Sequence, residues 1–452
     1  MTIAGSRPAS GQPRIVPAGA PDFDQARQAF NLAVDQRPQE VAYPSDAHEV
    51  AALVRRAGER GLRIAAQRAG HGAQPLDWER PAVLLRTDAM QGVTIDAAAR
   101  TARVDAGVKW DDVVDDLSEL GLAALHGSAR DISIAGYSLG GGLGWLARKH
   151  GLQANSVTAI ELVTADGEFV RADHEHEPDL FWALRGGGGN FGVVTALEFG
   201  LYPVAELYAG AFFFDFERGG EVLHAWGELT AGAPEELTSV FKLLQLPDLP
   251  EIPDPLRGKA FAAVTAAFLG EEAEGAALVE PLRQLGPMLD TFAMVPPVAL
   301  SFIAQDPEDP LPYTSSHHLM GELPGEAVDK LIEVGGAGSG SPLAMIELRH
   351  LGGALARSEP HHGAYAAMNG EYVLFALGGI LAPEDAPVMV EAVDRVAAAM
   401  EPWRSGWYLN FVERPSDMSL AFDAETWRRL QEVKARVDPD GLFLANHQIP
   451  AP

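Results

Sequence analysis

Apolar and polar residues form two kinds of pattern along this chain, one typical of helices and one typical of short strands. After a turn at residues 44–46, where Ser45 or Asp46 can cap a helix, four apolar residues lie at helical spacing: Val50, Leu53, Val54 and Ala57. The next apolar run, residues 63–67, has the length of a strand. This region therefore predicts a strand, a helix and a strand that lead to the loop of residues 68–73.

The rest of the pattern predicts an α+β fold. Strands are expected at residues 82–86, 92–96, 101–107, 157–164 and 168–171, and helices at 110–121 and 179–184. After Pro203, strands at 210–216, 260–268, 343–348 and 372–377 alternate with helices, which indicates a second domain. The last part predicts a helix at 424–437 and an extended tail at 441–450. Because polar Asn446 and Gln448 lie among apolar neighbours in that tail, we expect it to pack on the first domain.

Glycine is concentrated where the apolar pattern is interrupted, at residues 68–73, 139–146 and 185–192. Each glycine inside a helix costs about 1 kcal/mol relative to alanine, so these segments need another reason for their composition. Backbone amides in a concave loop bind pyrophosphate, and glycine lets the backbone approach it closely. The spacing of a dinucleotide-binding Rossmann turn is missing, which disfavours NAD.

Composition narrows the class of protein further. The 452 residues are 47% hydrophobic, so the chain can form large cores and bury a cofactor. A formal charge of -29 disfavours nucleic acid and anionic membranes as partners. No stretch has the roughly 18 apolar residues of a membrane span, and we expect a cytoplasmic protein. Residues 1–22, rich in Gly, Pro, Ser and Ala, predict a poorly ordered leader before the fold begins.

Several segments of the chain together resemble one family. They are Arg-Ala-Gly-His-Gly at residues 68–72, the glycine run at 136–144, the stretch 179–195, and the C-terminal segments at 408–411 and 446–449. In this combination the chain resembles the flavin-dependent oxidoreductases with an FAD-binding domain of the vanillyl-alcohol-oxidase (PCMH) type, specifically the berberine-bridge-enzyme-like branch. The resemblance covers nearly the whole chain.

This resemblance implies a division of the chain. An FAD-binding domain of two subdomains would span residues 23–203, after the leader at 1–22. A substrate domain with an antiparallel sheet and helices would span residues 204–412. The C-terminal segment at 413–452 would then return to the FAD-binding domain.

The resemblance also implies how FAD is held. His71 matches the histidine that bonds to the 8α carbon of the flavin, and neutral imidazole is a competent nucleophile for that bond. Relatives with a doubly attached flavin carry a cysteine two residues after the position of Gly127, where this chain has Ala129. We therefore expect one covalent bond and no cysteinyl bond, in a chain without cysteine. The residues expected to contact FAD are Arg68, Ala69, Gly70, Gly72, Ala73, Gly136, Leu139, Gly140, Gly141, Gly142, Gly144, Val157, Val194, Asn446 and Gln448.

Tyr408 matches the tyrosine that the family places beside the flavin ring as a general base. A phenol with a pKa of about 10 is a poor base at neutral pH, so a nearby positive charge must tune it or its proton transfer must be concerted with hydride loss. Arg349 or His350 could supply the charge or bind substrate, and Asn410 is a further substrate candidate. The alternatives are that Tyr408 is an ordinary half-buried strand residue and that His71 is a loop histidine bonded to backbone carbonyls.

The sequence predicts no metal site. His174 and His176 precede a helix start at Pro178-Asp179 and are expected in a solvated turn, and the adjacent histidines at 317–318 and 361–362 diverge on either a helix or a strand. The leading hypothesis is an FAD-dependent oxidase that moves hydride from a small organic substrate to flavin and then electrons to dioxygen. A flavin dehydrogenase with another electron acceptor and a non-catalytic flavin-carrying protein are the alternatives. The substrate, whether sugar, alcohol or secondary metabolite, and the oligomeric state are left open.

Overall fold

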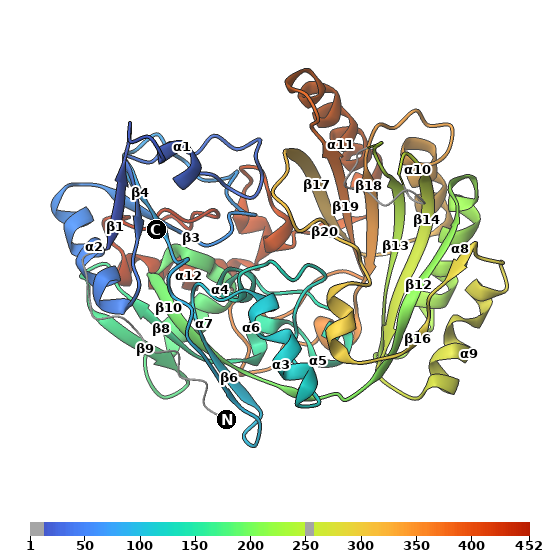
Figure 1. Ribbon diagram of the computed structural model, residues 1–452, viewed down its shortest axis with the longest axis horizontal. Helices are drawn as coiled ribbons and strands as arrows, with labels where there is room; N and C mark the ends of the chain where they lie inside the picture. Colours follow the sequence, from blue (N-terminus) through green and yellow to red (C-terminus); the bar gives the residue numbers. More distant parts are fainter. Residues whose placement is uncertain (1–12, 249–256) are drawn as a thin grey trace.

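The structure is a computed structural model that describes residues 13–248 and 257–452. Two halves lie side by side, one built mainly from the N-terminal part of the chain and the other from its middle (Figure 1). Helices and sheets occur in both halves, which confirms the predicted α+β fold. The division of the chain at residues 203/204 and 412/413 stays a prediction.

The first sheet has the order β1-β2-β4-β3, with β2, β4 and β3 parallel, and it contains the strands predicted at residues 63–67 and 82–86. The strands are β1 (Arg14–Pro17), β2 (Glu40–Tyr43), β3 (Arg63–Gln67) and β4 (Ala82–Arg86). Helix α2 (Ala47–Glu59) joins β2 to β3 and packs Val50 and Val54 into the same apolar core as Ile64 of β3. Of the two expected caps, Asp46 is the one whose side chain accepts the Glu49 backbone N–H.

The expectation that the fold begins after residue 22 is wrong. Strand β1 pairs antiparallel with β2, and Val16 is buried against the apolar side of the sheet. Four residues are too few for a periodic pattern to stand out among prolines and glycines, so composition alone concealed this edge strand. Residues 1–12 of the expected leader lie outside the described residues.

The second sheet is antiparallel and has the order β5-β6-β10-β8-β9. Its strands are β5 (Val93–Asp96), β6 (Thr101–Asp105), β8 (Val157–Val163), β9 (Phe169–Asp173) and β10 (Val193–Gly200). The helices of this region are α3 (Val114–Glu119), α4 (Ile134–Leu139), α5 (Ala147–His150), α6 (Gln153–Ser156) and α7 (Pro178–Gly187). The single helix expected at 110–121 is divided into a 3-10 turn (Trp110–Asp112) and α3, because the backbone of Val113, with φ of -135°, is not helical.

The largest sheet belongs to the second half and has the order β15-β12-β14-β13-β18-β19-β17-β20, with β16 beside β12. Its long strands are β12 (Leu207–Asp215), β13 (Leu237–Gln245), β14 (Ala260–Phe268), β17 (Tyr313–Met320), β18 (Met345–His350) and β19 (Tyr372–Gly379). The short strands are β15 (Leu289–Asp290), β16 (Ala293–Val295) and β20 (Arg404–Gly406).

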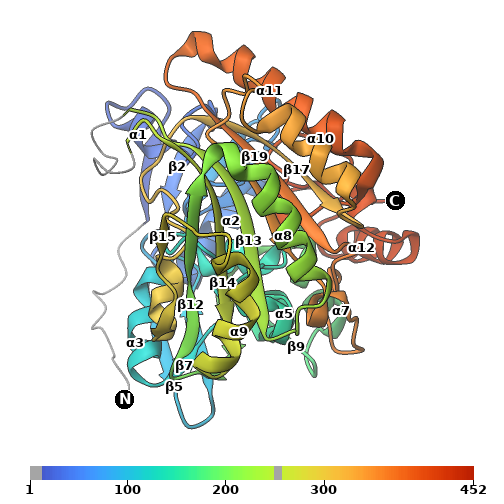
Figure 2. The same cartoon turned by 90° about the vertical axis from the view of Figure 1, so that its right-hand side faces the viewer.

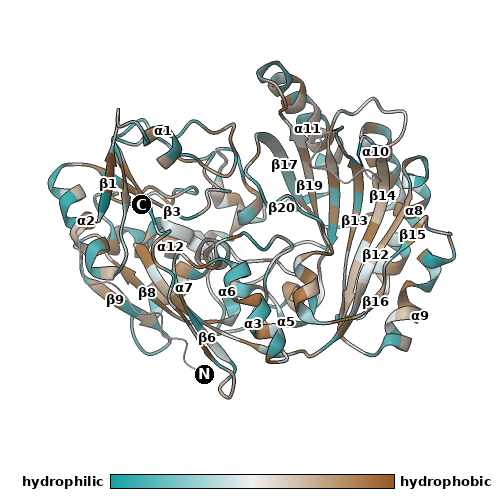
Figure 3. Ribbon diagram, in the orientation of Figure 1, coloured by the Kyte–Doolittle hydropathy of each residue, from teal (hydrophilic) through white to brown (hydrophobic). Residues whose placement is uncertain are grey.

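Helices cover one face of this sheet and leave the other toward the first half (Figures 1 and 2). They are α8 (Gly219–Ala231), α9 (Glu272–Arg283), α10 (Gly325–Gly335) and α11 (Ala386–Met400). The residues between them form one apolar core, and Figure 3 shows hydrophobic residues along the strands with mixed hydropathy on these helices. In the part of the chain that the structure describes, no helix is long and apolar enough to cross a membrane.

The C-terminal segment returns to the first half of the molecule, as predicted. Helix α12 (Ala424–Val437) has the bounds expected from its pattern. In the tail after it, the Leu444 N–H donates to the Ile64 carbonyl, and the Ile64 N–H donates to the Leu442 carbonyl, both at 2.8 Å. The tail therefore lies along the edge strand β3, immediately before the loop that carries His71.

Candidate active site

His71 lies in a tight loop that follows β3. Its ring stacks on Phe30 with 3.8 Å between ring centroids, and its Nε2 atom lies 3.4 Å from Oδ2 of Asp131. Gly70, with φ of 90°, makes the preceding turn in a conformation that favours glycine. The His71 ring is thus held between an aromatic face and a buried carboxylate.

Buried polar atoms without a hydrogen-bond partner gather around this loop. They include Nε2 of His71, Oδ1 of Asp131, both amide atoms of Gln67 and Oε1 of Gln74. Buried polar groups are normally hydrogen-bonded, so unpartnered atoms from this loop, the end of β3 and Asp131 fit the polar contacts of a ligand. The loop therefore fits the FAD that the resemblance implies.

The other loop residues expected to contact FAD are engaged partly by the protein. Arg68 donates from Nε to the Gly107 carbonyl at 2.8 Å and pairs with Asp88 at 3.1 Å. The Ala69 carbonyl accepts the Phe30 N–H at 3.0 Å, and Ala73 is buried. These contacts hold the loop in its shape, because they fix the Arg68 side chain and the Ala69 backbone.

The glycine run at 140–144 has a structural reason that sequence reasoning missed. An added Cβ at Gly140 would lie 1.8 Å from Oδ1 of Asn410, and one at Gly144 would lie 2.0 Å from the His126 carbonyl oxygen. At Gly142 it would lie 2.6 Å from the Tyr137 ring. The side-chain positions of these three glycines are therefore filled by protein atoms, so their composition does not by itself require a diphosphate.

Other glycines do face open space. An added Cβ at Gly136, in the first turns of α4, or at Gly189 would meet nothing within 4 Å. At Gly72 it would lie 2.8 Å from Nδ2 of Asn446, so the tail and the His71 loop touch here. Glycine at position 136 therefore leaves the backbone accessible, whereas glycine at position 72 allows Asn446 to pack closely against the loop.

Four further residues expected to contact FAD, Val157, Val194, Leu139 and Gln448, contact other parts of the protein. Val194 pairs with Leu162 and Val157 pairs with Phe199, at opposite ends of the β8/β10 ladder. Leu139 is buried in the same apolar core as Val157 and Val194. In the tail, Gln448 donates its amide to the Ala445 carbonyl at 3.1 Å. These side chains have protein partners.

Tyr408 lies beside the glycine run and is 1% exposed. Its hydroxyl oxygen accepts hydrogen bonds from the Leu143 backbone N–H at 2.9 Å and from Nδ2 of Asn410 at 3.2 Å. Burial raises the pKa of Tyr408 to about 12, although these two donors and the charge of Arg349 act in the opposite direction. Tyr408 is thus a buried phenol with several groups that favour its ionised form, and it is not a half-exposed strand residue.

Arg349 is the cation near Tyr408. Its guanidinium lies 5.2 Å from the centre of the Phe411 ring, which is 4.9 Å from the Tyr408 ring. It forms an ion pair with Glu347 and donates to Ser128 Oγ at 3.2 Å.

His350 cannot supply the charge that was considered for it. It follows Arg349 on β18, and side chains of successive strand residues point to opposite faces. Its ring stacks on Tyr372, 5.8 Å away, in the direction of the core under the helices. Burial lowers the pKa of His350 to about 3, so the ring is neutral at physiological pH.

Buried charges that sequence reasoning missed lie next to Arg349. Lys242 of β13 is 3.2 Å from Glu347 and 3.4 Å from Asp306. Lys242 and Glu347 are register partners on neighbouring strands, so the pairing follows from the sheet and not from any local motif. These two cations and two anions balance each other on the face of the sheet that is not covered by helices.

A second missed group surrounds Glu413, which is 9% exposed. The Tyr313 hydroxyl donates to its Oε1 at 2.7 Å, and the Ser315 hydroxyl donates to its Oε2. Burial raises the pKa of Glu413 to about 7. Glu413 follows the Tyr408 segment by five positions, but nothing local indicates that two β17 hydroxyls meet it.

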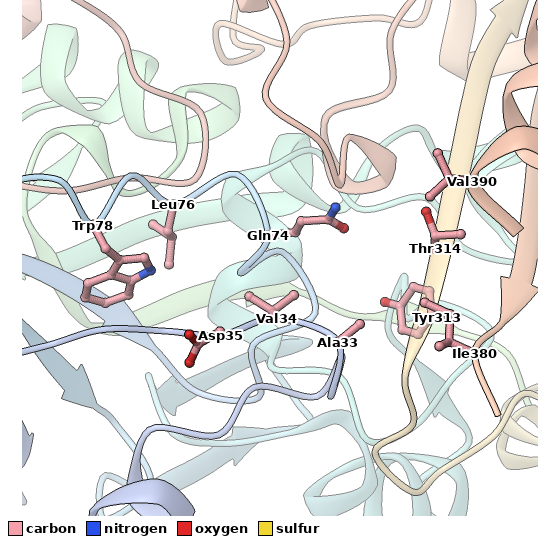
Figure 4. A pocket seen from close by; sticks show the side chains of 10 residues that line it. All are labelled: Ala33, Val34, Asp35, Gln74, Leu76, Trp78, Tyr313, Thr314, Ile380 and Val390. Carbon is pink, nitrogen blue, oxygen red and sulfur yellow. The ribbon is translucent and has the colours of Figure 1, made fainter. Parts of the chain in front are cut away.

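A cavity of about 300 Å³ lies between the loop that follows His71 and the large sheet (Figure 4). Gln74 and Trp78 line it from the loop, and Tyr313 lines it from β17. Its full lining is Ala33, Val34, Asp35, Gln74, Leu76, Trp78, Tyr313, Thr314, Ile380 and Val390. Neither Tyr408 nor any residue of the glycine run lines this cavity.

The histidine clusters weighed in the sequence behave as separate residues. His317 approaches Trp407 and Phe411, whereas His318 lies 3.8 Å from Glu401. His176 pairs with Asp173 at 2.9 Å in an exposed turn. Over residues 13–248 and 257–452, no group of three or more His, Asp or Glu residues is arranged to hold a metal ion.

Comparison with known proteins assigns the same cofactor class. Residues 38–173 match the model of an FAD binding domain. An FAD-linked oxidoreductase of Dictyostelium discoideum is 26% identical over 95% of this chain and 93% of its own length. The (R)-6-hydroxynicotine oxidase of Paenarthrobacter nicotinovorans is 33% identical over 47% of this chain and 46% of its own length.

Solved structures share the fold over almost the entire chain. The BBE-like 1 protein of Physcomitrella patens superposes with a TM-score of 0.84 at 20% identity, covering 97% of both chains. The sequence resemblance to the berberine-bridge-enzyme-like branch is thereby confirmed at the level of family and fold. The chain therefore contains an FAD-binding domain, is similar in sequence to FAD-linked oxidoreductases and has the fold of the berberine-bridge-enzyme-like proteins.

Proposed function

We propose that this FAD-dependent oxidoreductase is an oxidase that carries FAD on His71 through a single 8α-histidyl bond. It removes hydride from a small organic molecule and passes the electrons to dioxygen. The observation that carries the proposal is the buried Tyr408 hydroxyl, which accepts two N–H hydrogen bonds at the glycine run. A buried phenol oxygen that accepts two N–H hydrogen bonds has its ionised form stabilised, which suits it to proton transfer.

His71 would hold the flavin, and Gly70, Gly72, Gly136 and Asn446 would line the cofactor. His71 and the unpartnered Asp131 and Gln67 atoms support this assignment. A bound flavin supplies the hydride acceptor, and the protein supplies binding, orientation and proton transfer.

Tyr408 would take the substrate proton at its Oη atom. Its pKa of about 12 means that the phenolate, which is the form able to take this proton, is rare at neutral pH, so the phenol proton must first be lost to solvent. The donors Leu143 N–H and Asn410 Nδ2 would stabilise the phenolate before it takes the substrate proton.

The substrate would be neutral, a class that includes sugars, alcohols and uncharged secondary metabolites. On the open face of the large sheet, Arg349 and Lys242 are paired with Glu347 and Asp306. A charged substrate would find no uncompensated partner among these groups, and desolvating it there would be unfavourable.

The test is reduction of the bound flavin by a panel of neutral alcohols, sugars and aromatic alcohols, followed anaerobically by loss of the visible flavin absorbance. Tyr408→Phe should retain FAD and lose most of this reduction. A wild-type protein that binds no FAD would refute the proposal, and equal reduction by Tyr408→Phe would remove Tyr408 from the mechanism.

The electron acceptor needs a separate measurement on the same reduced sample. We expect oxygen consumption with peroxide formation to match the rate of flavin reduction, since an oxidase returns its electrons to dioxygen. Rapid reoxidation by an artificial dye with slow oxygen uptake would instead identify a dehydrogenase. FAD binding without reduction by any substrate would support a non-catalytic flavin carrier.

A further inference from the structure

Asp131 is a buried carboxylate whose environment is unusual. It is 6% exposed, its Oδ1 atom has no hydrogen-bond partner, and its Oδ2 atom lies 3.4 Å from Nε2 of His71. The adjacent Arg130 turns away, because it pairs with Asp115 at 3.1 Å and lies over the Phe302 ring. Among the described residues, no lysine or arginine forms an ion pair with Asp131. A buried carboxylate in this state is costly unless another group uses it.

His71 is the group in position to use it. Phe30 stacks on the imidazole at 3.8 Å between centroids, with 28° between the ring planes, and restrains the plane of the ring. Nε2 is buried and is the ring nitrogen next to Asp131, so Nδ1 is the nitrogen without this carboxylate neighbour. A carboxylate beside one imidazole nitrogen selects the tautomer with the proton on that nitrogen and raises the basicity of the other.

We propose that Asp131 is a positioning residue for covalent flavin attachment, which holds the proton of His71 on Nε2 and leaves the Nδ1 lone pair as the nucleophile. The inference rests on the proposed attachment of FAD to His71. In a hydrolase triad, a carboxylate orients a histidine that acts as a base. Here the carboxylate would orient a histidine that forms the covalent bond itself.

A bond forms between Nδ1 of His71 and the 8α carbon of the flavin, and one C–H bond of the 8α methyl group breaks, with its proton released to solvent. The second proton leaves from Nε2 toward Asp131, and the electron pair reduces the flavin ring. Dioxygen, the acceptor of the proposed oxidase, then takes the two electrons and restores the oxidised flavin.

The experiment compares the wild-type protein with Asp131→Asn and Asp131→Glu. The matched control is Asp115→Asn, which removes the exposed carboxylate that pairs with Arg130. Each protein is purified and incubated with added FAD. Total FAD is measured by absorbance, and covalent FAD is measured by the mass of the acid-denatured chain. Non-covalent FAD affinity is measured separately by fluorescence.

We expect Asp131→Asn to bind FAD with an affinity within about threefold of wild type and to form the covalent bond at least tenfold more slowly. Asp131→Glu should recover part of the rate because it keeps the carboxylate, and Asp115→Asn should match wild type. A purely structural role for Asp131 would lower FAD affinity and covalent fraction together, and that result overturns the proposal. An unchanged attachment rate in Asp131→Asn overturns it as well.

The wild-type protein offers a test that no folding defect can obscure. NMR of the flavin peptide released by proteolysis should place the bond at Nδ1 of His71, and a bond at Nε2 overturns the assignment of Asp131. If wild type binds FAD without any covalent bond, the proposed attachment fails and this inference fails with it. If wild type is covalent and Asp131→Asn is equally so, only the inference fails.

Discussion

Glu413 should make the stability of this protein depend on pH in an uncommon direction. Its carboxyl is buried and accepts hydrogen bonds from the hydroxyls of Tyr313 and Ser315. Burial raises its pKa from 4.5 to about 7 despite these donors, so the folded protein favours the protonated form. Glu413→Gln replaces that form with a neutral side chain of nearly equal size.

The magnitude follows from linkage between protonation and folding. Between pH 4.5 and pH 7 the folded state binds more protons at this site than the unfolded state, so stability falls as pH rises through that window. The stabilisation is fully present below the unfolded value and is lost above the folded value. A difference of about 2.5 pH units corresponds to about 3 kcal/mol of unfolding free energy, to order of magnitude.

The assay is urea unfolding of wild type and Glu413→Gln, both saturated with FAD, at pH values from 4 to 8. The difference in unfolding free energy between the two proteins should shift by about 3 kcal/mol in favour of Glu413→Gln over this range. Glu425→Gln, which removes an exposed carboxyl, is the control and should show no such shift. A difference that is constant with pH, or that shifts toward wild type, would refute the reasoning.

The remaining predictions concern the site and the glycines. Tyr408→Phe should slow flavin reduction by about 10²- to 10⁴-fold with unchanged FAD content, as measured by stopped-flow absorbance. Arg349→Met should move the rising limb of the pH profile of that reduction, where Tyr408 ionises, to higher pH, because Arg349 lowers the pKa of Tyr408; an unmoved limb would contradict this. Gly144→Ala should destabilise the protein by about 3 kcal/mol or more in urea unfolding, since its Cβ would lie 2.0 Å from the His126 carbonyl oxygen. Gly136→Ala, which faces open space, should change unfolding free energy by about 1 kcal/mol or less and weaken FAD binding; unaltered FAD affinity would argue against cofactor contact there.

Local pattern was sufficient for much of the secondary structure. Helix α12 and strand β14 have the bounds that their periodicity predicted, because each combines a clear apolar rhythm with flanking turn residues. Strand β1 was not predicted because four residues are too few to show a periodic apolar pattern. Its stability comes from pairing with β2.

The glycine run shows where local interpretation was incomplete. Sequence reasoning correctly treated residues 140–144 as exceptional, but it assigned the cause to a ligand. Three of those glycines are required by contacts with Asn410, Tyr137 and the His126 carbonyl, and the first of these lies far along the chain. Close packing of a distant segment and close approach of a cofactor call for the same residue, so composition cannot separate them.

The sequence by itself determined the cofactor class, the α+β architecture and the separate candidates His71 and Tyr408, because motifs and periodicity are local properties. Only the tertiary structure decided which groups act on those candidates. It placed Asp131 beside His71, set Leu143 on the Tyr408 hydroxyl across 265 residues, and directed Arg349 and His350 to opposite faces of one strand. Such contacts depend on the register of the strands and on the path of the C-terminal tail. Both are selected by the free energy of burying apolar surface throughout the chain, which no local segment determines.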